Sequence, residues 1–242
     1  KITQRAHGRQ QLRLLPFLLY SRGYGFLYQF VLFDLDGTLT DPREGITKSV
    51  QYALDKMGIH EADLTALEHF IGPPLYDEFS RCYGFSDAQA KAAVEAYRER
   101  FSVVGWKENI LFEEVPDLLR QLKQAGRQIA IASSKPTVFV EKILHLFGIY
   151  DYFDAVSGAS LDGKIGTKAQ VVSQALRMLH AVPGQSVLVG DRFHDVDGAR
   201  ENGIPCIGVT FGFGGRDELL RAGAASIADS IQSLLSLLLQ PD

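Results

Sequence analysis

The sequence predicts an α/β protein built on a doubly wound parallel sheet, with a helical domain inserted into it. Two observations lead to this prediction. Short apolar segments alternate with segments of helix length from residue 30 onward, which is typical of parallel sheets with right-handed crossovers. In addition, residues 35–127 separate the first expected strand from the second. A crossover needs only about a dozen residues, so we expect a separate group of helices there.

Six apolar segments are the expected strands. In the strongest of them, β-branched and aromatic residues follow one another directly, as in strands that are buried on both faces. The segments are FVLFD (30–34), QIAIAS (128–133), FDAVSG (153–158), SVLVGD (186–191), PCIGVT (205–210) and ASIADS (225–230). The expected helices of this part of the chain are residues 136–147, 168–180, 196–202 and 217–222, followed by the apolar helix face of IQSLLSLLLQ.

The long interval between the first two strands reads as four helices. They are expected near residues 45–57, 63–70, 75–83 and 87–101, with glycines and prolines between them. The expected domains are a core of residues 28–42 and 111–242, a helical domain of residues 43–110, and an N-terminal extension of residues 1–27. The extension is basic and has no acidic residue, as in some import signals. We interpret it as a natural or added segment that precedes the domain.

Composition and charge restrict the classes of partner. The chain has 25 Lys and Arg residues against 29 Asp and Glu residues, for a formal charge of −4. This balance gives no basic face for a nucleic acid polymer, and no stretch reaches the length that spans a membrane. The two cysteines, Cys82 and Cys206, lie far apart, and Cys206 falls in an apolar segment. We therefore expect no disulfide and a reducing, cytoplasmic location.

Four aspartates follow two of the expected strands. Asp34 and Asp36 end the first strand, where an Asx turn or an Asp-Gly turn would each explain one of them. Two carboxylates so close together repel each other and call for a cation. Asp191 and Asp195 follow the strand at 186–191, and Asp195 also fits as the N-cap of the next helix, so both roles stay open. Carboxylates at neighbouring strand ends suit Mg²⁺, which prefers oxygen ligands.

Two further segments could contact an anion. Ser133 and Ser134 end the second strand, and Pro136 is expected to begin the next helix. A serine there would cap the helix, and its hydroxyl and the adjacent backbone N–H groups would also form an anion site. The two interpretations are compatible.

A lysine in an unfavourable position is the other candidate. Thr167 and Gln170 match a capping box, which places Lys168 in the first turn of a helix. A cation there opposes the helix dipole at a cost of about 0.3–1 kcal/mol, so we expect a negative group to offset it. Lys164 is the alternative cation, but its loop places it less well.

Taken together, these segments resemble the haloacid dehalogenase-like superfamily of aspartyl-phosphate phosphatases. The sequence DLDGT at 34–38 matches its first motif, Ser133 its second, Lys168 its third and GDRFHD at 190–195 its fourth. The segments FIGPPL, SSKP, YFDAVSG and FGFGGRDEL further resemble the branch that is similar to phosphoglycolate phosphatase. The resemblance covers about residues 29–236. It implies a Rossmann-like core, with the inserted helices as the cap domain.

The resemblance implies a role for each aspartate. Asp34 would be the nucleophile that forms an aspartyl-phosphate. Asp36 would act as general acid and then as general base. Mg²⁺ would be held by Asp34, the backbone carbonyl of Asp36 and Asp191, with Asp195 as a further ligand or a support to the ligands.

The resemblance also implies how the substrate is held. Ser133 and Lys168 would bind the remaining phosphoryl oxygens, with Ser134 beside them. Gly37 and Thr38 would let the chain turn tightly around the phosphate. Candidates for contact with the leaving group are Arg43, Arg98 and the turn at 72–75.

The expected function is hydrolysis of a small phosphomonoester, either phosphoglycolate-like or a nucleoside monophosphate. A sugar phosphomutase of the same superfamily is the alternative, because it uses an equivalent pair of aspartates and a similar cap. A non-catalytic relative is a third interpretation, which the presence of all the motif residues disfavours. The chain is expected to be a monomer or a homodimer.

Overall fold

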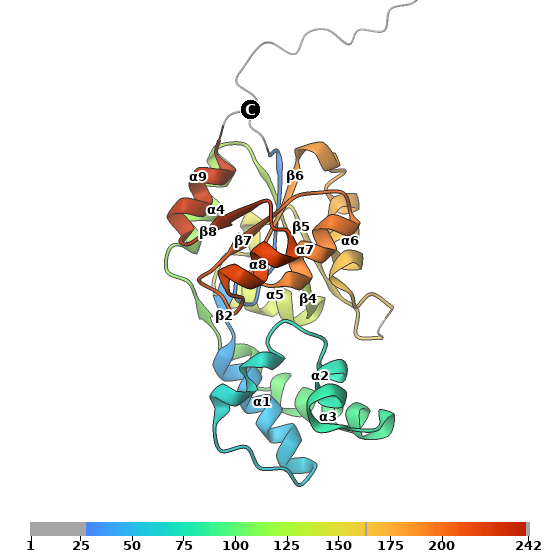
Figure 1. Ribbon diagram of the computed structural model, residues 1–242. Coiled ribbons are helices and arrows are strands. Elements are labelled where there is room, and N and C mark those ends of the chain that lie inside the picture. Colours follow the sequence, from blue (N-terminus) through green and yellow to red (C-terminus); the bar gives the residue numbers. More distant parts are fainter. Residues whose placement is uncertain (1–27, 163, 241–242) are drawn as a thin grey trace, which may run out of the picture.

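The protein is a six-stranded parallel sheet between two layers of helices, with a group of further helices below it (Figure 1). The computed structural model describes residues 28–162 and 164–240. The predicted doubly wound parallel sheet is confirmed. The expected extension at 1–27 lies outside the described residues. The strands of the sheet are β1 (Phe30–Phe33), β4 (Gln128–Pro136), β5 (Ala155–Ala159), β6 (Ser186–Gly190), β7 (Cys206–Val209) and β8 (Ser226–Ala228).

The strand order places the reversal of the chain at β1. The order across the sheet is β5-β4-β1-β6-β7-β8, so the chain runs outward from β1 first on one side and then on the other. Phe33, the last residue of β1, pairs with Ile131 of β4 and with Val189 of β6. The carboxyl ends of these three strands therefore meet at one edge, at the type of position where open α/β sheets bind ligands.

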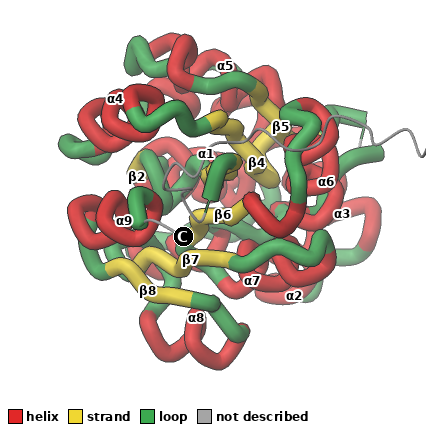
Figure 2. The backbone as a smooth tube through the Cα atoms, turned by 90° about the horizontal axis from the view of Figure 1, so that it is seen from above, coloured by secondary structure: helices red, strands yellow, loops and turns green. Residues whose placement is uncertain are grey.

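Alternate side chains of β1 enter two separate cores, which explains why its sequence is apolar throughout. Val31 and Phe33 belong to one buried cluster, and Leu32 belongs to the other. The first cluster is covered by α4 (Val115–Gln124), α5 (Thr137–Leu146) and α9 (Ile231–Leu238), and the second by α6 (Lys168–Met178), α7 (Phe193–Glu201) and α8 (Arg216–Ala222). Figure 2 shows the strands between these two sets of helices.

The helical insertion has a hydrophobic core of its own. Phe70, Phe79 and Leu54 are buried at its centre, and Phe139 of α5 packs at its edge. Its elements are α1 (Arg43–Lys56), the 3-10 helix η1 (Leu64–Phe70), α2 (Leu75–Tyr83), α3 (Asp87–Phe101) and the 3-10 turn η2 (Gly105–Lys107). Two short antiparallel strands, β2 (Thr40–Asp41) and β3 (Ile110–Leu111), join it to the sheet. The remaining 3-10 turns are η3 (Tyr150–Tyr152) and η4 (Pro183–Gln185).

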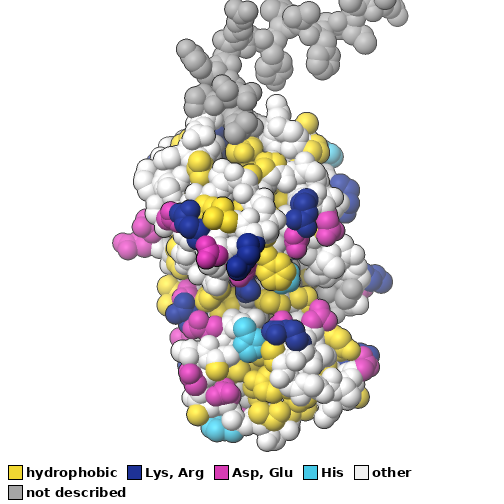
Figure 3. Space-filling view, in the orientation of Figure 1, with side chains coloured by type: hydrophobic (Ala, Val, Ile, Leu, Met, Phe, Trp, Pro, Cys, Tyr) yellow, Lys and Arg dark blue, Asp and Glu magenta, His cyan; other side chains and the backbone are white. Residues whose placement is uncertain are grey.

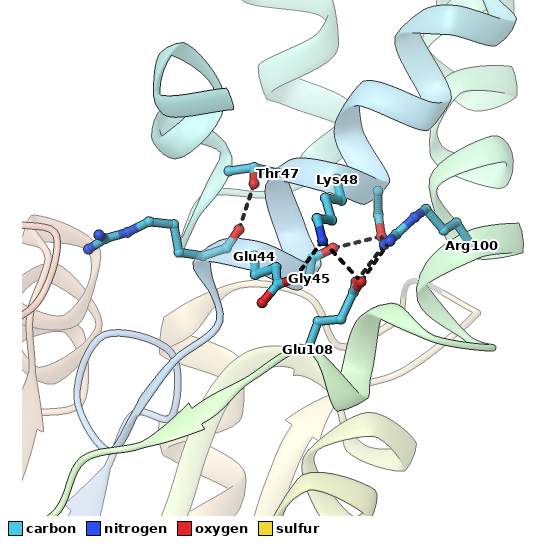
Figure 4. A network of polar contacts seen from close by, with 8 residues as sticks. Glu44, Gly45, Thr47, Lys48, Arg100 and Glu108 are labelled. Atoms are coloured by element: carbon cyan, nitrogen blue, oxygen red, sulfur yellow. Dashed lines mark hydrogen bonds and ion pairs between the residues drawn. The ribbon is translucent and has the colours of Figure 1, made fainter. Parts of the chain in front are cut away.

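A polar network ties the two ends of the insertion together (Figure 4). Arg100 donates two hydrogen bonds to the carboxylate of Glu108, at 2.7 and 2.9 Å. The backbone N–H of Gly45 donates to the carbonyl of Glu108 at 3.0 Å. Lys48 lies 2.5 Å from Glu44 and 3.6 Å from Glu108. The start of α1 and the end of α3 are thereby fixed to the segment that returns to the sheet.

One predicted boundary is wrong in a way that affects the site. Strand β4 continues through Pro136, which pairs with Ala159 after a register shift that begins at Ser133. Helix α5 begins at Thr137 and has no side-chain cap. Pro136 therefore does not begin the helix, and neither Ser133 nor Ser134 caps it. The predicted anion site, made by a serine that caps this helix, is therefore not formed at the start of α5.

The surface carries charges of both signs. On the face drawn in Figure 3, Lys and Arg side chains alternate with Asp and Glu side chains over the sheet-bearing part and over the helical insertion. Within residues 28–162 and 164–240, none of the helices has both the length and the apolar character needed to cross a bilayer.

Candidate active site

Three buried aspartates converge at the edge where β1 and β6 end. Asp34 follows β1, Asp191 follows β6, and Asp195 lies in the first turn of α7. One carboxylate oxygen from each lies within 4.8 Å of the others. The side chains are brought together because β1 and β6 pair directly in the sheet, with Phe33 opposite Val189.

Asp195 does not have the N-cap position that the sequence suggested. Helix α7 begins at Phe193, so Asp195 is its third residue and Arg192 is the N-cap. The Asp195 carboxylate accepts a hydrogen bond from the backbone N–H of Arg192 at 3.0 Å. A Cβ atom at Gly190 would lie 2.1 Å from the Asp195 carboxyl carbon. The absence of a side chain at Gly190 therefore allows Asp195 to pack against the strand end.

Lys168 lies between two of these carboxylates. The capping box of Thr167 and Gln170 is confirmed, and it places Lys168 at the start of α6. The Lys168 Nζ atom is 2.8 Å from Asp34 Oδ1 and 2.9 Å from Asp195 Oδ1. Burial opposes the charge on this ammonium, but the two carboxylates together outweigh it and raise the pKa of Lys168. Asp34 and Asp195 are therefore the negative groups that we expected to offset the charge of Lys168 in the first turn of the helix.

The second aspartate of the DLDGT segment faces a different cation. Asp36 is buried, and its Oδ2 atom lies 2.5 Å from Nζ of Lys135. Burial raises the pKa of Asp36, while the charge and hydrogen bond of Lys135 oppose that shift. The Asp36 carboxylate is therefore not part of the three-carboxylate group, and the predicted metal contact of Asp36 is through its backbone carbonyl.

Lys135 is the functional candidate that sequence reasoning missed. Its only signal was a cation directly after the two serines of SSKP. Its side chain is 5% exposed, and its Nζ atom lies 5.0 Å from the centre of the Phe101 ring in the helical insertion. Lys135 reaches Asp36 from the irregular end of β4, and the sequence pattern predicted a helix start there instead.

The turn after Asp36 is tight and closely packed. Gly37 has a φ angle of +80°, and a Cβ atom on it would lie 2.2 Å from Asp191 Oδ2. A side chain would therefore be strained and would collide with the carboxylate. The hydroxyl of Thr38 is buried and has no hydrogen-bond partner among the described residues.

The three-carboxylate group fits a divalent cation. Asp34, Asp191 and Asp195 place three carboxylates beside the single ammonium of Lys168 in a buried place. Burial, and then the charges of Asp195 and Asp34, raise the pKa of Asp191 well above its usual range. The Asp191 Oδ1 atom has no hydrogen-bond partner within the described chain. Unsatisfied, mutually repelling oxygen ligands of this kind are the donor set that suits Mg²⁺.

A cavity of about 420 Å³ extends from this edge into the helical insertion. At the sheet end it is lined by Asp34, Asp36, Ser133, Ser134 and Lys135. On the opposite side the lining is largely aromatic and apolar, with Phe70, the turn at 72–75, Tyr97, Arg98, Phe101 and Phe139.

Two predicted cations lie apart from the cavity. Arg43 forms ion pairs with Asp41 and Glu68 and does not line it. Lys164 is exposed and pairs with Asp162 at 2.9 Å. Of the arginines proposed for contact with the leaving group, Arg98 is the one that the structure places in the lining.

Comparison with known proteins identifies relatives over most of the chain. Residues 31–209 match the family described as haloacid dehalogenase-like hydrolase. A protein of Pseudomonas aeruginosa named 5'-nucleotidase is 49% identical over 192 residues, which cover 79% of this chain and 87% of that protein. The tyrosine-protein kinase PtkA of Mycobacterium tuberculosis is 42% identical over 191 residues, which cover 78% of this chain and 64% of that longer protein.

A solved structure shows the same fold. The crystal structure of a predicted phosphatase from Clostridium acetobutylicum superposes with a TM-score of 0.85 at 46% sequence identity. The match covers 87% of this chain and 97% of that one.

Proposed function

Because this chain belongs to the haloacid dehalogenase-like hydrolase family and is a phosphoric monoester hydrolase, we propose that it is a magnesium-dependent phosphatase that acts through an aspartyl-phosphate. The observation that carries this proposal is the grouping of Asp34, Asp191 and Asp195 within 4.8 Å, beside a cavity that Asp34 lines. Lys168 contacts two of these carboxylates. This arrangement provides a nucleophile, oxygen ligands and a cation in one place.

Four groups would hold the magnesium ion. They are the carboxylates of Asp34, Asp191 and Asp195 and the backbone carbonyl of Asp36; the Asp36 carboxylate is engaged with Lys135. When bound, Mg²⁺ would neutralise the negative charge of the phosphoryl oxygens. Lys168, Ser133 and Ser134 would bind the other phosphoryl oxygens, and the turn at Gly37 and Thr38 would enclose the phosphate.

Two aspartates would carry out the covalent chemistry. A carboxylate oxygen of Asp34 bonds to phosphorus as the bond from phosphorus to the ester oxygen breaks. Asp36 donates a proton to that departing oxygen and then accepts one from the water that hydrolyses the aspartyl-phosphate. The products are an alcohol and phosphate, and Asp34 is regenerated. The raised pKa of Asp36 supports this role, because the group must hold a proton for the first step.

The helical insertion would act as the cap. We assign residues 43–110 to the cap domain and residues 28–42 and 111–242 to the catalytic core. The separate buried cluster of the insertion supports this division, and so does the cavity that both parts line. A cap in this position would exclude bulk water from the reacting phosphate and would contact the leaving group.

Within the cavity, the lining favours a nucleoside monophosphate over phosphoglycolate. Phe70, Tyr97 and Phe101 provide aromatic surface for a base. The carboxylate of phosphoglycolate would need a cation, but Lys135 is paired with Asp36, and Arg98 is paired with Glu95 at 2.8 Å. The similarity to a protein named 5'-nucleotidase supports the same choice.

The partner and location follow from the same proposal. The partner would be a small phosphate ester, rather than a nucleic acid polymer or a membrane. The free thiols of Cys82 and Cys206 support a reducing, cytoplasmic location. We also propose that the chain acts as a monomer or a homodimer.

The test is phosphate release from nucleoside monophosphates, phosphoglycolate and sugar phosphates, with and without Mg²⁺. We expect release that requires Mg²⁺, is fastest with a nucleoside monophosphate and is abolished in Asp34→Asn. Asp162→Asn, which changes an exposed carboxylate, should keep full activity. Activity that persists in Asp34→Asn would disprove the nucleophile. Interconversion of sugar phosphates without phosphate release would indicate a mutase instead. The assays also include ATP with a tyrosine peptide, because one relative of this chain is named tyrosine-protein kinase PtkA.

A further inference from the structure

We propose that His69, Glu78 and Cys82 form a second metal site, suited to Zn²⁺, in the helical insertion. His69 lies in η1, and Glu78 and Cys82 lie in α2. None of the three lines the cavity described above, so this site is separate from the three-carboxylate group. It combines a thiol, an imidazole and a carboxylate, the ligand types that zinc takes in proteins.

The three ligand atoms lie close to the spacing of a zinc site. Cys82 Sγ lies 3.2 Å from His69 Nε2 and 3.5 Å from Glu78 Oε2. His69 Nε2 lies 3.9 Å from Glu78 Oε2. Tetrahedral zinc with ordinary bond lengths separates such ligand atoms by roughly 3.3–3.6 Å. Small side-chain adjustments would therefore bind the ion without a change in the main chain, and the fourth position would be open to water.

An independent contact orients the imidazole toward the site. His69 Nδ1 lies 2.8 Å from the backbone carbonyl of Ala66, which is outside the cluster. A carbonyl oxygen can only accept a hydrogen bond, so Nδ1 carries the proton. The lone pair of Nε2 therefore points at Cys82 and Glu78. Histidine ligands of metal ions are typically held in this way, with the far ring nitrogen donating to a carbonyl or carboxylate.

The carboxylate is ionised and can be shared with the ion. Glu78 is 7% exposed, and burial opposes its charge, but Arg81 more than compensates and lowers the pKa of Glu78. Arg81 lies 2.5 Å from Glu78 Oε2, and its side chain is 65% exposed. Because the guanidinium also contacts Oε1 at 3.3 Å, it can keep that contact while Oε2 binds the metal.

The thiol supplies the softest ligand of the site. Cys82 is exposed, and its Sγ atom faces both His69 and Glu78. Zinc binds the thiolate, and the thiol proton is released to water as the bond to zinc forms.

Metal binding would connect two segments of the cap. Residues 69 and 82 flank the turn at 72–75, which lines the substrate cavity. An ion held at both ends would restrict this segment, and backbone amides of 70–81 should exchange more slowly with solvent when Zn²⁺ is bound. This result would be independent of the phosphatase reaction.

The decisive experiment uses Co²⁺ and Zn²⁺ with the full-length protein after removal of metals, in an excess of Mg²⁺ that occupies the oxygen site. We expect one equivalent of Co²⁺ to produce a sulfur-to-cobalt charge-transfer band that Zn²⁺ displaces. The band should be lost in Cys82→Ala and kept in Cys206→Ala, the matched control for the other thiol. His69→Gln should weaken Zn²⁺ binding by at least about 10–100-fold. Loss of a contact that only supports a metal ligand already has an effect of this size.

A second measurement uses the unaltered protein and does not depend on variants that fold. Zn²⁺ should slow alkylation of Cys82, identified by peptide mapping, and leave the buried Cys206 unaffected. Absence of the cobalt band, its persistence in Cys82→Ala, or equal alkylation of Cys82 with and without Zn²⁺ would each overturn the proposal. Metal ions that bind only at the carboxylates would give no sulfur-to-cobalt band and no protection of Cys82, and would count against the proposal.

Discussion

Lys135 Nζ lies 2.5 Å from Asp36 Oδ2, although the two residues are 99 positions apart in the sequence. Both side chains are buried, and the same ammonium faces the ring of Phe101 in the helical insertion. One lysine therefore contacts both the residue that we propose to move protons and the proposed cap. This pair gives the first prediction.

Replacing Lys135 with methionine should move the pH dependence of catalysis. The lysine lowers the pKa of Asp36, against the larger effect of burial, so its loss should raise that pKa further. Since Asp36 must be protonated to act as the acid, the alkaline limb of the kcat/KM profile should shift to higher pH. The profile should be measured beside that of Asp36→Asn, which should lack the limb. An unchanged limb in Lys135→Met would contradict the assignment.

Lys168→Met should lower kcat by about 10²–10³-fold, because an ammonium aimed at the phosphoryl oxygens would be removed. Lys164→Met is the matched control, since Lys164 is exposed and pairs with the exposed Asp162. Steady-state phosphate release compares the two. Equal activity in both variants would exclude Lys168 from phosphate binding.

The variants Lys168→Met and Lys164→Met also test the stability of the protein at alkaline pH. The folded-state pKa of Lys168 is raised above its ordinary value of 10.5. Its stabilising effect is therefore complete below that value and is lost as the pH rises through the folded-state pKa. The Tm of the parent protein should fall more steeply above pH 10.5 than the Tm of Lys168→Met, and Lys164→Met should follow the parent.

Asp191→Asn should stabilise the protein when Mg²⁺ is absent. The folded-state pKa of Asp191 is raised well above 3.8, so the folded state holds a proton that the unfolded state has released. The free energy of unfolding therefore falls as the pH rises from 3.8 through the folded-state pKa of Asp191. An asparagine side chain does not titrate, so the variant avoids this decrease. The amide oxygen can still accept from the Phe213 N–H, which Asp191 does at 2.7 Å. At neutral pH we expect a gain of about 1–3 kcal/mol in the free energy of unfolding.

Added Mg²⁺ should make the parent protein more stable than Asp191→Asn. The ion stabilises whichever form binds it, so the parent should gain stability and Asp191→Asn should gain little. Denaturant unfolding with and without Mg²⁺ measures both effects. Equal stabilisation of both proteins by Mg²⁺ would show that Asp191 is not a ligand.

Gly45→Ala should disturb the base of the helical insertion (Figure 4). A Cβ atom there would lie 2.1 Å from the carbonyl oxygen of Gly105, so α1 or η2 must move. Overpacking of this kind typically costs about 1–3 kcal/mol. Gly184→Ala is the control, because a Cβ atom at Gly184 would meet nothing within 4 Å. Thermal unfolding of the two variants checks this, and similar Tm values would contradict the predicted clash.

Most helices and strands of this protein could be derived from local sequence patterns, but helix α4 and the short strands β2 and β3 were not predicted. Continuous apolar segments predicted the strands, because a strand that is buried on both faces needs apolar residues at every position. The capping box of Thr167 and Gln170 predicted the start of α6 and the position of Lys168. Asp34 and Asp191 directly follow strands that pair in the sheet. Their proximity follows once a parallel sheet is assumed.

The tertiary structure decided what these side chains contact. The bulge near the end of β4 brings Lys135 to Asp36, and the early start of α7 makes Asp195 a buried partner of Lys168 instead of an N-cap. The grouping of His69 with Cys82 likewise depends on how η1 packs against α2. Helical and strand periodicity reports which face of an element is buried. Contacts between residues far apart in the sequence depend on strand register, irregularities and packing, which local patterns do not encode.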